Sequence, residues 1–169
     1  MPMDRGGFFE EPIDYALKQM SIGEVAGGGT LRDVTGEIKK CDVEIYLYEK
    51  SDAYYDKLHS FLMFLGVPKG SFLISGNVKR KIGNLEGLAL YLNGTDLDNE
   101  IYNSCDVNFA ISEMIRILGS EYKYHSYWEG AKETALYFYG ESFIKMNDLV
   151  IPFINDYPLC KKSRIIQIA

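Results

Sequence analysis

The residues in this chain best suited to acid–base chemistry are a histidine and a glutamate four positions apart, His125 and Glu129. An imidazole assisted by a carboxylate can act as a general base. If 122–129 is a strand, the two side chains share one face, but they are too far apart for a direct hydrogen bond unless the strand bends. Ser126 points to the other face, and no serine or cysteine nearby has the setting of a nucleophile. A small hydrolase using His125 and Glu129 therefore stays an alternative function.

The chain lacks the spacings typical of metal, phosphate and disulfide sites. Its three cysteines, Cys41, Cys105 and Cys160, are far apart and indicate free thiols in a reducing compartment. Its two histidines offer no usual zinc spacing. The acidic run 96–100 lacks the glycine and the last ligand of a calcium loop. The glycines of 27–30 lack the lysine of a phosphate loop and predict a turn or a bulge at the end of a strand. We therefore expect no cofactor and no metal.

Net charge separates the classes of partner. The formal charge of −6 repels nucleic acid phosphates and anionic membrane surfaces, whereas it speeds the encounter with a basic protein. No apolar run approaches the roughly 18 residues of a membrane span, and the first residues lack the pattern of a secretory signal. We expect a cytoplasmic protein with a protein partner, without nucleic acid or membrane binding.

A short strand pattern with tyrosines occurs three times, at 43–48, 88–94 and 134–140. Because side chains alternate along a strand, aliphatic residues take one face and tyrosines the other. Tyrosine is enriched in protein interfaces, so we expect the second face to bind a partner. The alternative is that the N-terminal helix and loops cover it. The tyrosines concerned are Tyr46, Tyr48, Tyr91, Tyr137 and Tyr139.

A second candidate surface is acidic. The segment 84–108 has no lysine or arginine and contains Glu86, Asp96, Asp98, Glu100 and Asp106. Such a segment could mimic phosphates and occupy a basic cleft, where charge complementarity raises the association rate. The alternative is a solvated loop followed by a helix cap. Trp128, the only tryptophan, could anchor a partner or lie in the core.

Apolar spacing and helix-terminal residues predict the elements that position these side chains. Helices are expected at about 12–20, from Ser51 to 65, from Asp106 to 118 and from Ser142 onward, with Pro152 kinking or shortening the last one. Further strands are expected at 71–75, 122–128 and 164–168. The apolar sides of the three repeated strands would lie beneath these helices.

This order predicts an α+β fold with a mainly antiparallel sheet and helices on one face. A helix and strand at 8–30 would precede three strand–helix–strand units at 38–76, 86–128 and 133–169, as an extended ferredoxin-like arrangement in which split βαβ units repeat about three times. The chain length favours one domain over 1–169.

Four stretches taken together, 23–30, 65–71, 86–94 and 157–160, carry a resemblance over most of the chain. They resemble small uncharacterised bacterial proteins of the kind that includes immunity proteins encoded beside polymorphic toxins. The resemblance implies a bacterial protein that neutralises a toxin by direct binding, and it transfers no site residue to this chain.

The leading interpretation is a non-enzymatic, cytoplasmic immunity protein that binds and occludes a cognate toxin with a basic surface. Besides the hydrolase, a ligand-sensing or structural subunit whose sheet pairs with another copy stays an alternative. The sequence leaves monomer or homodimer open.

Overall fold

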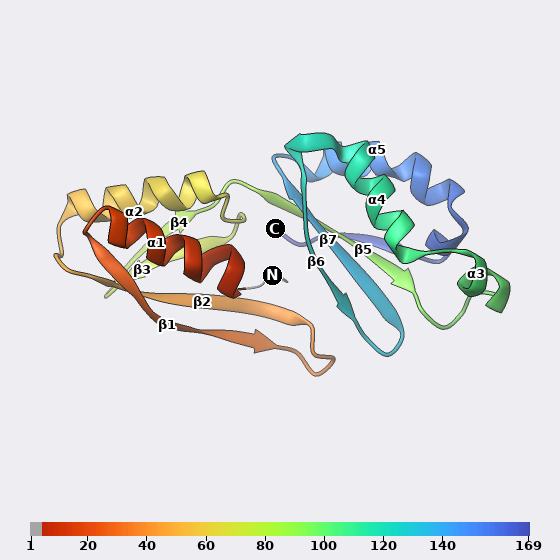
Figure 1. The fold of residues 1–169 in the computed structure, drawn as a ribbon, viewed down its shortest axis with the longest axis horizontal. Helices are drawn as coiled ribbons and strands as arrows, with labels where there is room; N and C mark the ends of the chain where they lie inside the picture. The colour runs from red at the N-terminus through yellow and green to blue at the C-terminus, as the bar shows by residue number, and fades with distance from the viewer. Residues whose placement is uncertain (1–4) are drawn as a thin grey trace. The chain divides into compact units, whose positions relative to one another are not determined.

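A computed structural model describes residues 5–169 of the chain, which divides into two compact units, Met1–Asn84 and Leu85–Ala169 (Figure 1). Both units combine helices with antiparallel sheets. The predicted α+β class with antiparallel pairing is therefore confirmed. The single-domain organisation stays a prediction.

The first unit contains two separate two-stranded sheets, β1–β2 and β3–β4. Each is an antiparallel pair of strands that follow one another in the chain. A helix precedes each pair along the chain. The elements are η1 (Gly6–Glu10), α1 (Glu11–Gln19), β1 (Gly23–Arg32), β2 (Ile38–Leu47), α2 (Asp52–Leu65), β3 (Ser71–Ser75) and β4 (Val78–Ile82).

Local chemistry explains how these helices pack and where they end. Pro12 is the second residue of α1, which continues directly from η1. Ile13 and Leu17 bury one side of α1, and the carboxylate of Asp14 accepts a hydrogen bond from the backbone N–H of Val25 at 3.0 Å. That bond ties α1 to β1. Gly66 ends α2 in the left-handed conformation that favours glycine.

The second unit is one four-stranded sheet with strand order β6-β7-β5-β8 and antiparallel pairing throughout. Helices α4 and α5 cover one face of this sheet (Figure 1). The elements are β5 (Glu86–Asn93), α3 (Asn99–Ser104), α4 (Val107–Leu118), η2 (Gly119–Glu121), β6 (Lys123–Glu129), β7 (Glu133–Gly140), α5 (Phe143–Asp156), η3 (Pro158–Cys160) and β8 (Arg164–Gln167).

The core of the second unit lies between this sheet and its helices. Leu90 of β5 and Phe138 of β7 pack with Met114 of α4 and with Met146 and Val150 of α5, all essentially without exposed surface. The sequence predicted that the apolar side of these strands would lie beneath the apolar sides of the helices. For β5 and β7 this prediction is confirmed.

The predicted caps of α4 and α5 are also present. Asp106 accepts a hydrogen bond from the N–H of Asn108 at 2.8 Å, and the hydroxyl of Ser142 accepts one from the N–H of Lys145 at 3.4 Å. Pro152 does not shorten α5, which continues as far as Asp156. Ile154, in the turn after the proline, is buried in the core.

The glycine run was expected to be a turn or a bulge; the strand does not turn there, but its pairing with β2 is irregular, as in a bulge. Gly27, Gly28 and Gly29 lie inside β1, paired with residues 42–44 of β2 after a register shift between Val25 and Gly27. A Cβ on Gly28 would collide with the backbone carbonyl oxygen of Asp42. Close approach of the two strands, and not reversal of the chain, therefore explains the glycine.

The threefold repetition of split βαβ units is not confirmed. The second and third tyrosine strands, β5 and β7, are direct neighbours, with Ala89 opposite Tyr137 and Tyr91 opposite Ala135. The first tyrosine strand, β2, instead pairs with β1 in a sheet of its own. The sequence interpretation also missed β4, whose residues 78–82 are mostly basic and show no apolar alternation.

Candidate partner-binding surface

An exposed row of two carboxylates and two tyrosines runs along β2. Asp42, Glu44, Tyr46 and Tyr48 occupy alternate positions, so they share one face of the strand, and all four are exposed. The exposed Lys40 precedes them on the same face. Tyr46 is 58% and Tyr48 53% exposed. Tyr48 follows the last residue of β2, and its N–H still donates to the carbonyl of Ile22 at 3.0 Å. We call these four residues the β2 stripe.

The neighbouring strand leaves the carboxylates of the β2 stripe uncovered because it offers glycines there. Gly27 is the register partner of Glu44, and Gly29 that of Asp42. The atoms nearest to where a Cβ would stand on these glycines are carboxylate oxygens, of Glu44 at 3.7 Å and of Asp42 at 3.5 Å. Both carboxylates thus lie over bare backbone and are accessible from solvent.

The two tyrosines of the stripe support each other. Their ring centroids are 6.0 Å apart with an interplanar angle of 64°, an edge-to-face arrangement. Glu24 of β1 is the register partner of Tyr46 and adds a third carboxylate beside the stripe. Such a surface can cover an apolar area with the rings while its carboxylates pair with lysine or arginine of a partner.

The five predicted tyrosines do not form one exposed row. Tyr137 and Tyr139 have no exposed surface and Tyr91 has 7%. The guanidinium of Arg164 lies 3.7 Å from the centroid of the Tyr91 ring, and it also pairs with Glu133 at 2.7 Å. The prediction of one tyrosine face fails because β2 belongs to a different sheet from β5 and β7.

The predicted acidic segment divides into structural and exposed carboxylates. Glu86 accepts a hydrogen bond from the N–H of Phe143 at 2.6 Å, at the start of α5, and Asp106 caps α4. Asp96, Asp98 and Glu100 are exposed in the loop before α3 and in its first turn. Asp106 is exposed as well, so four of the five carboxylates lie at the surface, one of them engaged as the cap of α4.

The side chain of Trp128 is half-buried and folds back over its own turn. The atoms nearest to where a Cβ would stand on Gly130 belong to the indole ring of Trp128. The glycine thus makes room for the tryptophan. The sequence left two alternatives for Trp128, a core residue or an anchor for a partner. Its half-buried side chain fits neither one fully.

A β-bulge separates the two residues of the hydrolase hypothesis. The register of β6 against β7 shifts between Tyr124 and Ser126, so the regular alternation expected over 122–129 is wrong. The ring of His125 contacts that of Tyr139 with centroids 5.0 Å apart. Glu129 instead pairs with Thr134, which lies on the other face of β7. The carboxylate therefore does not face the imidazole.

The electrostatic setting of His125 also disfavours base catalysis. Burial lowers its pKa to about 4, and the charge of Lys123 adds to the effect. A histidine with this pKa is neutral near pH 7 but holds a proton only weakly, which makes it a poor general base.

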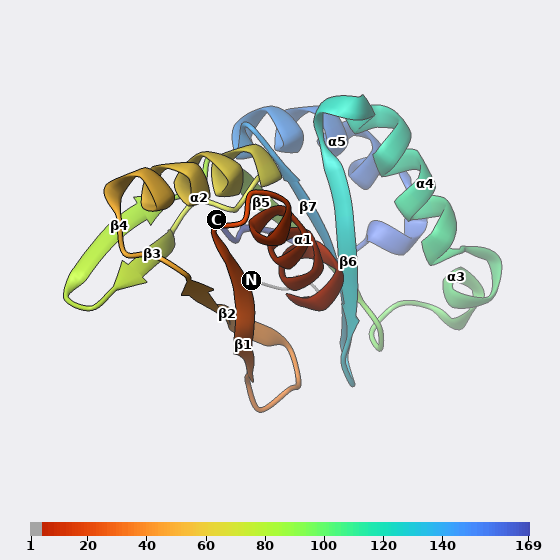
Figure 2. The same cartoon turned by 60° about the vertical axis from the view of Figure 1, so that its left-hand side comes forward.

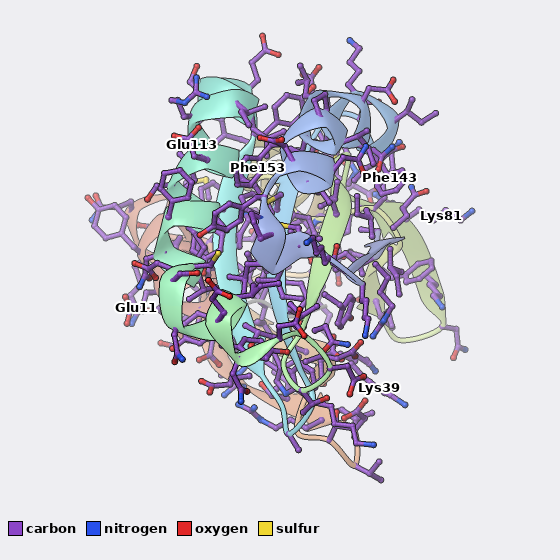
Figure 3. The ribbon with its side chains drawn as sticks, turned by 90° about the vertical axis from the view of Figure 1, so that its right-hand side faces the viewer. Glu11, Lys39, Lys81, Glu113, Phe143 and Phe153 are labelled. Atoms are coloured by element: carbon purple, nitrogen blue, oxygen red, sulfur yellow. The ribbon has the colours of Figure 1, made fainter. Side chains whose placement is uncertain are left out.

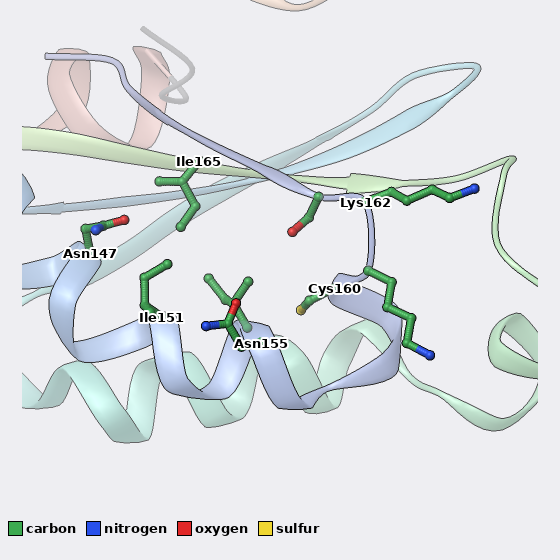
Figure 4. A pocket seen from close by; sticks show the side chains of 9 residues that line it. Asn147, Ile151, Asn155, Cys160, Lys162 and Ile165 are labelled. Atoms are coloured by element: carbon green, nitrogen blue, oxygen red, sulfur yellow. The ribbon is translucent and has the colours of Figure 1, made fainter.

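A pocket of about 450 Å³ lies between α5 and the edge strand β8 (Figure 4). Ile151, Ile165 and the sulfur of Cys160 point into it, whereas the side chain of Lys162 extends away and donates to the carbonyl of Asp96 at 2.7 Å. Burial raises the pKa of Cys160 to about 11, so it is a protonated thiol at neutral pH and not a nucleophile. Its lining is mixed, because Asn147 and Asn155 of α5 face the same space as the isoleucines.

Among residues 5–169, His, Cys, Asp and Glu side chains form no group of three or more that could hold a metal ion. No helix in this described part of the chain has both the length and the apolar character needed to cross a membrane. Comparisons of the chain with protein-family models, curated proteins and solved structures found no match.

Proposed function

We propose that this chain is a binding protein that covers a basic surface of a protein partner with the β2 stripe. The observation that carries the proposal is the alternation of exposed carboxylates and tyrosines over residues 42–48. Lysine and arginine are the side chains that such carboxylates attract, and rigid rings give contact area at low entropic cost.

The dimensions of the stripe suit a specific interface. Seven residues of strand span roughly 20 Å, which is enough to cross the centre of a standard interface of about 800 Å² per partner. In such interfaces a few aromatic residues carry most of the affinity, each contributing about 2 kcal/mol or more. Tyr46 and Tyr48 are the residues placed to do so here.

We propose further that the partner is a cognate bacterial toxin and that the chain is its immunity protein, acting in the cytoplasm. A basic toxin surface would complement the net charge of −6. The free thiols of Cys41, Cys105 and Cys160 suit a reducing compartment.

For the second unit we propose a ferredoxin-like fold. Strands β5 and β6, joined through α3 and α4, lie on either side of β7, and strands β7 and β8, joined through α5, lie on either side of β5. This interleaving of two split βαβ units supports the proposal. The first unit contributes the stripe and lies outside this arrangement.

Co-expression with the toxin encoded next to the gene tests the proposed function. The wild-type chain should restore growth, and Tyr46→Ala/Tyr48→Ala should weaken toxin binding by about 30-fold or more. Tyr15→Ala/Tyr127→Ala is the matched control, because those two tyrosines are similarly exposed outside the stripe. Equal binding by both double variants would exclude the stripe, and failure of the wild-type chain to bind any neighbouring toxin would exclude the immunity function.

A further inference from the structure

One long stretch of this acidic chain carries basic residues and no acidic ones. Residues 57–85 contain no aspartate or glutamate but include five basic residues, whereas the whole chain carries −6. Three of the basic residues lie within β4. The five are Lys57, Lys69, Lys79, Arg80 and Lys81.

One face of the β3–β4 pair combines these charges with exposed apolar side chains. Phe72 is the register partner of Lys81, and Ile74 that of Lys79, so the four share a face. Phe72 is 40% and Ile74 65% exposed, and the amine of Lys79 lies 3.7 Å from the centroid of the Phe72 ring. The side chain of Lys81 extends away from the ribbon (Figure 3).

The other face of the pair is turned toward α2, which runs alongside (Figure 2). The hydroxyls of Ser75 and Tyr55 are hydrogen-bonded at 2.5 Å, and Arg80 pairs with Asp56 at 3.7 Å. These contacts fix the orientation of the pair on α2. The face with Lys79 and Lys81 is therefore the outward one.

Strand β4 also has an edge to which a further strand could add. Within residues 5–169, β3 and β4 pair only with each other. The backbone along such an edge alternates N–H donors and C=O acceptors. Phosphate oxygens of nucleic acids or lipids can accept from the N–H groups but cannot donate to the carbonyls, whereas a peptide backbone does both.

We propose that β4 binds an extended acidic protein segment by strand addition. Aspartate or glutamate at alternate positions of the segment would lie beside Lys79 and Lys81, because both strands repeat every second residue on one face. Dense polyanions fit less well, since the overall charge of −6 repels them. This surface is distinct from the β2 stripe and opposite in charge, so the inference does not rest on the proposed function.

The probe is a fluorescein-labelled peptide in which threonine and glutamate alternate, with binding followed by fluorescence anisotropy. Lys79→Glu/Lys81→Glu should weaken binding about tenfold or more, and raising salt from about 0.05 M to about 0.3 M should weaken the wild type similarly. Lys132→Glu/Lys145→Glu, which makes the same change in net charge at exposed positions of the second unit, should have little effect. Circular dichroism checks that each variant is folded.

N-methylated peptides separate strand addition from simple charge attraction. Methyl groups on alternate amides block one edge of the peptide, and methyl groups on the remaining amides block the other. One of the two peptides should lose binding while the other retains it. Equal binding by both would overturn strand addition.

Three further results would show that an acidic protein segment is not the ligand of β4. An oligothymidylate that binds more tightly than the peptide, and depends on Lys79 and Lys81, would make the surface a nucleic acid site. The same result with phosphatidylglycerol vesicles would make it a membrane site. Self-association of the unliganded protein that Lys79→Glu/Lys81→Glu abolishes would make the occupant a second copy.

Discussion

The β1–β2 and β3–β4 pairs of the first unit share an architecture but differ in surface chemistry. Each is a two-stranded antiparallel sheet with a helix before it in the chain. The outward residues of β2 from Asp42 onward are carboxylates and tyrosines, preceded on the same face by Lys40, whereas those of β3–β4 are lysines beside Phe72 and Ile74. Two strands do not form a buried layer, so the outward side chains are available for recognition, and their charge selects partners of opposite sign.

The two pairs also use glycine differently. In β1, Gly28 permits close approach of β2, since any Cβ there would meet backbone atoms. In β3–β4 the glycines Gly70 and Gly76 stand in turns at positive φ, with no atom close to a Cβ position. The β2 stripe therefore depends on a glycine within a strand, and the basic face of β3–β4 does not.

The largest expected effect comes from adding a side chain at Gly28, where the backbone of β2 leaves no room for one. Gly28→Val should destabilise the chain by about 3 kcal/mol, because the added side chain forces β1 and β2 apart. It should abolish toxin binding by the β2 stripe while leaving acidic-peptide binding to β4 in place. Urea denaturation and the two binding assays measure these effects.

Gly29→Ala is the control for this change, since the nearest atom to its Cβ position is 3.5 Å away. It should cost less than about 1 kcal/mol. If Gly28→Val left toxin binding unchanged, the β2 stripe would not depend on the close pairing of β1 with β2.

Acid should destabilise the chain through His125 of the second unit, because the two ring nitrogens of this half-buried histidine have almost no exposed surface. Its pKa is lowered to about 4 in the folded chain, below the ordinary 6.5, so the stability it contributes is present above pH 6.5 and is lost as pH falls toward 4. The free energy of unfolding should fall by about 2 kcal/mol between about pH 7 and about pH 4.5.

Urea denaturation of wild type and His125→Gln at the two pH values isolates this contribution. The variant should lose about 2 kcal/mol less than the wild type on acidification. An identical pH dependence in both proteins would mean that His125 is not held neutral by burial.

The smallest expected effect distinguishes local charge from net charge. Asp42→Lys/Glu44→Lys should slow toxin association about tenfold at low salt, because complementary charge mainly affects the association rate. Combining it with Lys79→Glu/Lys81→Glu restores the net charge to −6. Stopped-flow or surface-binding kinetics should show the same slow association in the combined variant. Recovery of the wild-type rate would mean that overall charge, and not the β2 stripe, steers the partner.

Much of the fold followed from periodicity and helix caps. Asp106 and Ser142 mark the starts of α4 and α5, and the leucines of β5 and β7 identify the helix-covered face. Strand pairing was not predictable, because the alternation in β2 says which side chains share a face but not which strand lies beside it. The charge run in β4 was passed over because it has no apolar period.

The candidate site was predicted in part. Tyr46 and Tyr48 are exposed as expected, while Asp42 and Glu44 were missed although the same alternation places them on the tyrosine side. Attention to a carboxylate at every second position would have found them. The bulge at His125 left no sequence signal, because neither glycine nor proline marks it.

The central claim is that partner contact occurs along the β2 stripe, and hydroxyl-radical footprinting of the chain with and without its bound toxin tests it most directly. We predict that complex formation protects Tyr46 and Tyr48 from oxidation severalfold, while the exposed Tyr15 and Tyr127 react as before. Unchanged oxidation of Tyr46 and Tyr48 in a complex that is demonstrably formed would contradict the account.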